Sequence, residues 1–233
     1  MSDILDYETY LLISPKKFII SVNTELEKKV YYEELIINSN LGFNKFEKLD
    51  FFLNQNIFKV EKKFKNFVEK IIIILDLDIF FPVEISIKKD NYDNFLNLKN
   101  LKHLLYEAKQ CCKKTLDKKK VVHMLIKNYR VDNKDFSYFP ENIKCHNFSL
   151  DLRLICISDD LIRDLETILK KYHISLNRVL DASYIQEFFS SDDRNIFSMA
   201  KKIIDGNNPN EVVLLDKTDK NQGFFEKFFN FFN

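Results

Sequence analysis

The spacing of apolar and polar residues predicts strands at the start of the chain and a helix soon after. Three short β-rich runs come first, at residues 10–14, 18–22 and 30–37. Pro15-Lys16-Lys17 separates the first two runs, which predicts a turn between two strands. Between Phe58 and Ile71 the apolar residues recur in steps of three and four, so this stretch is predicted to be a helix.

The middle of the chain reads strand, helix, strand, strand, helix, strand. The predicted strands are residues 83–88, 121–131, 149–158 and 176–182, and the predicted helices are 101–116 and 161–172. Asp159 or Asp160 is placed to cap the start of the second helix. This order predicts a compact α+β module with its helices against one sheet.

The end of the chain combines a polar linker with a run of phenylalanines. Gly206–Asn210 is a breaker cluster, and residues 216–222 are polar. On a helix, six phenylalanines after Gly223 fall within an arc of roughly 160°. They are Phe224, Phe225, Phe228, Phe229, Phe231 and Phe232. Such a helix either lies in the plane of a membrane and binds lipid through these rings, or docks on the protein's own core. The polar linker favours the membrane.

Charge and cysteine usage narrow the class of protein. The 36 Lys and Arg residues balance 35 Asp and Glu residues, for a net charge of +1, so we expect no nucleic-acid partner. The four cysteines show no CxxC spacing, which indicates a reducing cytoplasm. Residues 71–83 are the most apolar internal stretch, but Asp76 and Asp78 interrupt it, and no segment is predicted to span a membrane.

The sequence predicts no enzyme and no cofactor. Its three glycines are scattered at Gly42, Gly206 and Gly223, and a phosphate-binding loop needs glycine where backbone N–H groups approach the anion. Asp76 and Asp78 would point the same way on a strand, as a carboxylate pair or a solvated strand end. The neighbours Cys145 and His146 are two possible metal ligands, but no second pair has suitable spacing. Cys112 falls on the apolar face of its helix and is expected to be a core thiol.

Several segments together carry a resemblance to a known family. His123–Asp132, Leu150–Ser158 and Leu161–Ala182 are similar, in order and spacing, to consecutive elements of FtsA, the actin-like protein of bacterial cell division. Pro140 remains from the family's Pro-x-Gly-Met segment, and residues 181–184 stand at its small-residue and proline turn. The match covers the module inserted in the family's actin-like fold, known as domain 1C.

Two outlying segments agree with this resemblance. Leu11–Phe18 aligns with the family's first phosphate loop, but Leu12 replaces its Asp and Ser14 its Gly, so the loop is expected to be dismantled. The phenylalanine-rich end stands where FtsA carries a membrane-targeting helix. About forty residues separate Ser183 from that end, too few for the second actin lobe, which carries the remaining nucleotide loops and the docking surface for FtsZ.

The predicted architecture is therefore α+β: a partial actin-like first lobe with an inserted strand–helix–strand–strand module and a C-terminal amphipathic helix. The predicted parts are residues 1–78 (lobe remnant), 79–189 (domain 1C-like module), 190–222 (short helix and linker) and 223–233 (membrane-binding helix). The resemblance implies a non-catalytic adaptor of cell division on the cytoplasmic face of the inner membrane at midcell. Its expected partners are membrane lipid and other division proteins, with FtsZ in doubt because its usual docking lobe is missing.

Two alternatives stay open at this point. One is a soluble scaffold subunit, like the pilus-assembly actin homologues, whose phenylalanines dock in a partner's groove. The other is a protein with residual nucleotide binding.

Overall fold

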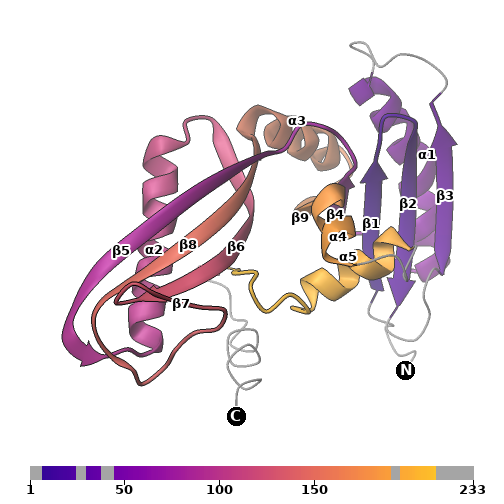
Figure 1. The fold of residues 1–233 in the computed structure, drawn as a ribbon. Helices are drawn as coiled ribbons and strands as arrows, with labels where there is room; N and C mark the ends of the chain where they lie inside the picture. Colours follow the sequence, from indigo (N-terminus) through magenta and orange to yellow (C-terminus); the bar gives the residue numbers. More distant parts are fainter. Residues whose placement is uncertain (1–6, 25–29, 38–44, 190–194, 214–233) are drawn as a thin grey trace. The chain divides into compact units, whose positions relative to one another are not determined.

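The structure, a computed structural model, describes residues 7–24, 30–37, 45–189 and 195–213. The chain divides into two compact units (Figure 1). Unit 1 comprises residues 1–80 and 159–205, and unit 2 comprises residues 81–158 and 206–233. Both units combine helices with a sheet, so the predicted α+β class is confirmed.

Unit 1 is built on a five-stranded sheet of order β3-β2-β1-β4-β9. The strands are β1 (Tyr7–Ile13), β2 (Lys17–Thr24), β3 (Tyr31–Ile36), β4 (Lys70–Leu75) and β9 (Ser175–Asp181). β1, β2 and β3 pair antiparallel, whereas β4 and β9 run parallel to β1. The carboxyl ends of β1, β4 and β9 therefore meet at one edge of the sheet.

Helices pack on both faces of the unit 1 sheet. They are α1 (Lys45–Phe64), α3 (Asp159–Lys170), α4 (Ala182–Phe188) and α5 (Ile196–Ile204). The Phe52 ring of α1 lies 6.1 Å from that of Phe18 on one face, and the Phe197 ring of α5 lies 6.1 Å from that of Tyr10 on the other. Because both faces are covered, most residues of β1 and β4 are buried.

Unit 2 is a four-stranded antiparallel sheet of order β5-β8-β6-β7 with one helix on one face (Figure 1). Its elements are β5 (Phe81–Phe95), α2 (Leu98–Thr115), β6 (Lys119–Val131), β7 (Lys134–Phe136) and β8 (Lys144–Ser158). Asn97 caps α2 by accepting the N–H groups of Lys99 and Asn100. The apolar face of α2 joins the alternate residues of β6 and β8 in one core.

A short segment after α5, residues 208–212, lies beside β6 on the side that faces away from β8; we call it the strap. Pro209 fills a turn in which the Glu211 N–H donates to the Asn208 carbonyl over 3.1 Å. The strap then pairs antiparallel with β6 at Leu125 and Glu211. The Ile126 N–H donates to the Asn210 carbonyl, and the Val212 N–H to the Met124 carbonyl, each over 2.8 Å.

The structure confirms most predicted elements and corrects two. The opening strands, the two middle helices and the strands at 121–131, 149–158 and 176–182 are all present. The helix predicted over residues 58–71 is wrong at both ends: α1 starts at Lys45 and ends at Phe64, before Lys65 at φ 54°. Ile71 belongs instead to the β-branched run of β4, which is paired on both sides.

The second correction concerns the sheet. A single sheet was predicted for residues 83–182, but β5, β6 and β8 form one sheet and β9 belongs to another, beside β4. Residues 159–189, predicted as the end of the inserted module, accordingly lie in unit 1. Residues 81–158 of unit 2 form a continuous insertion between β4 and α3, and they keep the predicted order of strand, helix, strand, strand with the short β7 added between β6 and β8.

Candidate functional site

The carboxyl ends of the three parallel strands of unit 1 border a cleft of about 680 Å³. The residues that line it are Ser14, Pro15, Lys16, Lys17, Asp76, Leu77, Asp78, Phe80, Asp181 and Ser183. In sheets of this kind ligands bind outside the carboxyl ends of the strands, so this cleft is the first place to look for a site. Nearly all of its lining comes from the segments that directly follow β1, β4 and β9.

The first of these segments is a tight turn that satisfies its own hydrogen-bonding groups. The Ser14 N–H donates to the Lys17 carbonyl over 3.0 Å. The Ser14 hydroxyl donates to the same carbonyl over 3.0 Å and accepts the Lys17 N–H over 3.1 Å. Pro15 has no N–H to offer. Two backbone donors of the turn are therefore engaged within it, and a third position lacks one.

The charges around the cleft are mixed. The Lys17 ammonium lies 3.5 Å from a Glu34 carboxylate oxygen, which offsets its charge. Lys16 is exposed. Asp76 and Asp78 follow β4, and Asp181 ends β9. Three carboxylates thus line the same cleft from two strand ends.

These carboxylates correct an expectation from the sequence. Asp76 and Asp78 were predicted to lie on a strand, but β4 ends at Leu75, so both lie in the loop beyond it. Asp181 lines the same cleft. Asp181 also caps α4 by accepting the Ser183 N–H over 2.9 Å. Within the described ranges, no three His, Cys, Asp or Glu side chains are grouped closely enough to hold a metal ion.

Unit 2 contains a buried polar contact that sequence reasoning missed. His123 on β6 is 1% exposed and Glu211 on the strap is 5% exposed. The His123 Nδ1 lies 2.8 Å from the Glu211 Oε1. Buried polar groups are destabilising without partners, so this contact fixes the strap to β6. The two residues are 88 positions apart, and no local pattern connects them.

The possible metal pair of Cys145 and His146 is not assembled. Cys145 is buried, with the Asn91 amide nitrogen 3.3 Å from its sulfur, whereas His146 is exposed. Neighbouring residues of a strand point to opposite faces, so the two side chains do not converge on one ion. Cys112 lies in the core of unit 2, as predicted. Burial raises its pKa, and raises the pKa of Cys156 to about 11, so both thiols stay protonated and unreactive.

The six phenylalanines predicted to bind lipid, Phe224 to Phe232, lie outside the described residues. Within the ranges that are described, no helix is both long enough and apolar enough to cross a membrane.

Comparisons with known proteins find similarity among solved structures. No family model matches this chain, and no match is found among the curated proteins. The PilM–PilN complex of type IV pilus biogenesis is similar at 9% identity and a TM-score of 0.42, over 76% of this chain and 48% of that one.

Two further structures show weaker scores. The cytoplasmic domain of EpsL, an inner-membrane component of the type II secretion system of Vibrio cholerae, matches at 11% identity and TM-score 0.35, over 77% of this chain and 57% of that one. A Bacteroides thetaiotaomicron protein with an actin-like ATPase fold matches at 12% identity and TM-score 0.35, over 81% and 58%. The chain thus spans about half the length of the structures it matches, and the resemblance to FtsA stays a prediction.

Proposed function

We propose that this chain is a non-catalytic adaptor of bacterial cell division that is tethered to the cytoplasmic face of the inner membrane. In this proposal unit 1 is the remnant of an actin-like lobe, unit 2 docks other division proteins, and the C-terminal phenylalanines bind lipid. The observation that carries the non-catalytic part is the turn between β1 and β2, which the resemblance to FtsA aligns with the first phosphate loop of that family.

A phosphate-binding loop presents free backbone N–H groups to the anion. Here the Ser14 and Lys17 N–H groups are both used inside the turn, and Pro15 has none. Among the described residues that line the cleft none is a glycine, so a Cβ atom stands at every position where a phosphate would need close backbone approach.

The charges of the cleft support the same conclusion. Asp76, Asp78 and Asp181 place negative charge where a polyphosphate would sit, against the two lysines of the turn. A like charge within the cleft disfavours anion binding in the absence of a bound cation. Nucleotide turnover is therefore not part of the proposed function.

The architecture of unit 2 suits docking. Residues 81–158, which hold all the helices and strands of the unit, are a continuous insertion between β4 and α3, so they can vary without interrupting the strands of unit 1. Its outer sheet face carries a polar row in which the Arg130 guanidinium contacts Asp135 at 2.7 Å and Asp151 at 3.4 Å. Exposed, mixed charges of this kind belong to the polar rim of protein interfaces rather than to small-molecule sites.

The first experiment addresses the tether. Full-length protein is sedimented with vesicles of mixed zwitterionic and anionic lipid, and we expect it to pellet with them. The double variant Phe224→Ser/Phe228→Ser should remain in the supernatant. The matched control, Phe58→Ser/Phe67→Ser, removes two rings that are 69% and 76% exposed outside the tail, and it should still pellet. Equal pelleting of all three proteins would refute the tether and favour the soluble scaffold.

A second experiment addresses the cleft. Addition of 1 mM Mg-ATP or Mg-ADP should leave the melting temperature unchanged, because a ligand that binds only the folded state must raise it. A rise that disappears in Asp76→Asn would contradict the non-catalytic reading.

In cells, a tagged full-length protein is expected in a membrane band at midcell that becomes diffuse without residues 223–233. A diffuse signal from both would exclude the proposed location.

A further inference from the structure

β5 leaves one side of its backbone without a neighbouring strand. It pairs with β8, and no other described strand lies beside it (Figure 1). Its register with β8 is regular from Phe81 to Asp90 and then shifts, where Tyr92 and Asp93 have φ values of 49° and 60°. An edge of ten residues in regular register, 81–90, thus offers unpaired backbone donors and acceptors, which is the template on which another strand adds.

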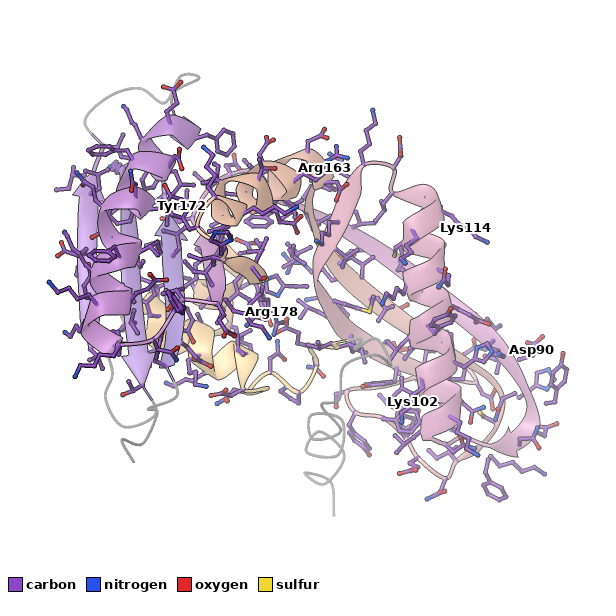
Figure 2. The ribbon with its side chains drawn as sticks, turned by 180° about the vertical axis from the view of Figure 1, so that it is seen from behind. Asp90, Lys102, Lys114, Arg163, Tyr172 and Arg178 are labelled. Carbon is purple, nitrogen blue, oxygen red and sulfur yellow. The ribbon has the colours of Figure 1, made fainter. Side chains whose placement is uncertain are left out.

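The side chains of this edge are incompletely buried on the core side. Phe81, Val83, Ile85 and Ile87 are partly buried against the core of unit 2, whereas the residues opposite all four of them on β8 are fully buried. One more strand beside β5 would remove further apolar area from water at these positions. On the outer face the residues are exposed: Pro82, Glu84, Ser86, Lys88 and Asp90, the last seen on β5 in Figure 2.

We propose that this edge binds the same edge of a second copy of the chain, antiparallel and centred on Ser86. Directly opposed residues of an antiparallel pair lie on the same face of the sheet. When two copies of one edge pair about a two-fold axis, one residue must therefore face the same residue of the other copy, and we call this residue the centre of the pairing. Only a few residues can be this centre, and the charges that each centre brings together on the outer face distinguish between them.

Five centres, from residue 84 to residue 88, keep most of the regular edge paired. A centre at Glu84 or at Lys88 opposes like charges, and a centre at Ile87 opposes Glu84 to Asp90. A centre at Ile85 opposes Glu84 to Ser86, without attraction between charges. A centre at Ser86 opposes Glu84 of each copy to Lys88 of the other, twice per dimer. Opposite charges on facing strands are stabilising and like charges destabilising, so the Ser86 register is selected.

The same register agrees with the rest of the edge. On the core face it opposes Ile85 to Ile87 of the second copy, two of the aliphatic residues that β5 leaves half-buried. At one end Lys89 points toward α2, with its ammonium 3.5 Å from Glu107, and at the other Pro82 lacks a donor. These features confine the pairing to the stretch between them.

Cysteine cross-linking tests the register in the full-length chain, with exposed Cys111 changed to Ser to remove background. Ser86→Cys places two cysteines opposite each other, at a Cα separation that a disulfide can bridge. We expect it to form a covalent dimer on mild oxidation. Glu84→Cys and Lys88→Cys should not cross-link alone but should do so when the two proteins are mixed. Cross-linking of each alone, or no cross-linking of the mixture and of Ser86→Cys, would overturn the proposal.

Charge exchange tests the interface without any covalent bond. Glu84→Lys and Lys88→Glu each turn two attractive contacts into repulsive ones. Each should therefore raise the dissociation constant of the dimer about tenfold or more, as measured by sedimentation equilibrium. The double exchange should restore the affinity of the unchanged chain. Because both residues are exposed, all three variants should keep the same melting temperature at a protein concentration low enough for the chain to be monomeric. A chain that is monomeric at all concentrations, or a double exchange that stays weak, would overturn the proposal.

This inference stands apart from the proposed function. It concerns the β5 edge of unit 2, and neither lipid binding nor the cleft of unit 1 enters its test. A soluble scaffold would satisfy it as well as a membrane-tethered adaptor.

Discussion

The contact between His123 and Glu211 is expected to hold the strap on unit 2. Both side chains are almost completely buried, at 0% and 4% exposure, and the His123 Nδ1 lies 2.8 Å from the Glu211 Oε1. A hydrogen bond that involves a charged group contributes about 1.5–3 kcal/mol net. Glu211→Leu removes this acceptor from a buried ring, so we expect it to lower the free energy of unfolding by about 2–3 kcal/mol, the upper part of that range.

The partner change, His123→Phe, should lower the free energy of unfolding by a similar amount. The double variant replaces both groups by apolar ones of comparable size, and it should lose less than the sum of the two single changes. We expect a coupling free energy of about 1–3 kcal/mol, as for residues in direct contact.

Two measurements check this expectation. Urea unfolding of the four proteins gives the coupling free energy, and amide hydrogen exchange gives its location. The exchange of the Ile126 and Val212 N–H groups should accelerate in Glu211→Leu, because both groups bond across the strap and β6. Single changes that add within about 0.5 kcal/mol, together with unchanged exchange at these two amides, would refute the reasoning.

Three further predictions concern separate parts of the chain. The pKa of Asp50 is lowered by the ammonium of Lys171 at 2.7 Å and the hydroxyl of Tyr172 at 2.8 Å. The ionised Asp50 side chain therefore stabilises the fold above its unfolded-state pKa of about 3.9, and this stabilisation is lost as the pH falls through the folded-state pKa. Asp50→Asn should therefore destabilise the protein by about 1 kcal/mol at pH 7, and the difference in urea unfolding should vanish in acid; a constant difference would contradict it. Leu154→Ala, at a fully buried position of unit 2, should cost about 2–5 kcal/mol in the same assay, and a loss below about 1 kcal/mol would contradict the described packing. A maleimide should label exposed Cys111 at once and the three buried cysteines only on unfolding; rapid labelling of more than one thiol in the native protein would contradict their burial.

Local patterns were sufficient to predict most individual elements. The alternation at Leu150, Leu152 and Leu154 predicts a strand with one buried face, and all three side chains are buried in the core of unit 2. The run of apolar residues at helical spacing that includes Leu101 and Cys112 likewise predicts α2, and both residues are buried. Where a pattern has one clear period and one side to bury, sequence reasoning succeeds.

The partition into two sheets was beyond such reasoning. β9 follows α3 as it would in a module of one sheet, yet its Leu180 pairs with Ile74 of β4, more than a hundred positions earlier. No local signal specifies which of several apolar strands a given strand will join. The error at residues 58–71 has a related cause, because the isoleucines of β4 continue the apolar spacing of α1 without a visible break.

The candidate site depends on the same long-range pairing. Asp76 and Asp78 were recognised as a pair in the sequence, but their proximity to Asp181 requires that β4 and β9 run parallel and end together. The contact of His123 with Glu211 requires the strap to return to β6 after α5. Both groups are invisible in the spacing of residues, since the elements that bring them together are far apart in the chain.

The strap also determines which interactions a pulling force on the C-terminal end would break first. A pull applied to the chain beyond residue 213 reaches β6 of unit 2 first, through two backbone hydrogen bonds and the contact of His123 with Glu211. These few interactions would yield at a lower force than the long ladders between β5, β8 and β6. Tension on the C-terminal end would thus peel the strap from β6 while the folded sheet stays intact.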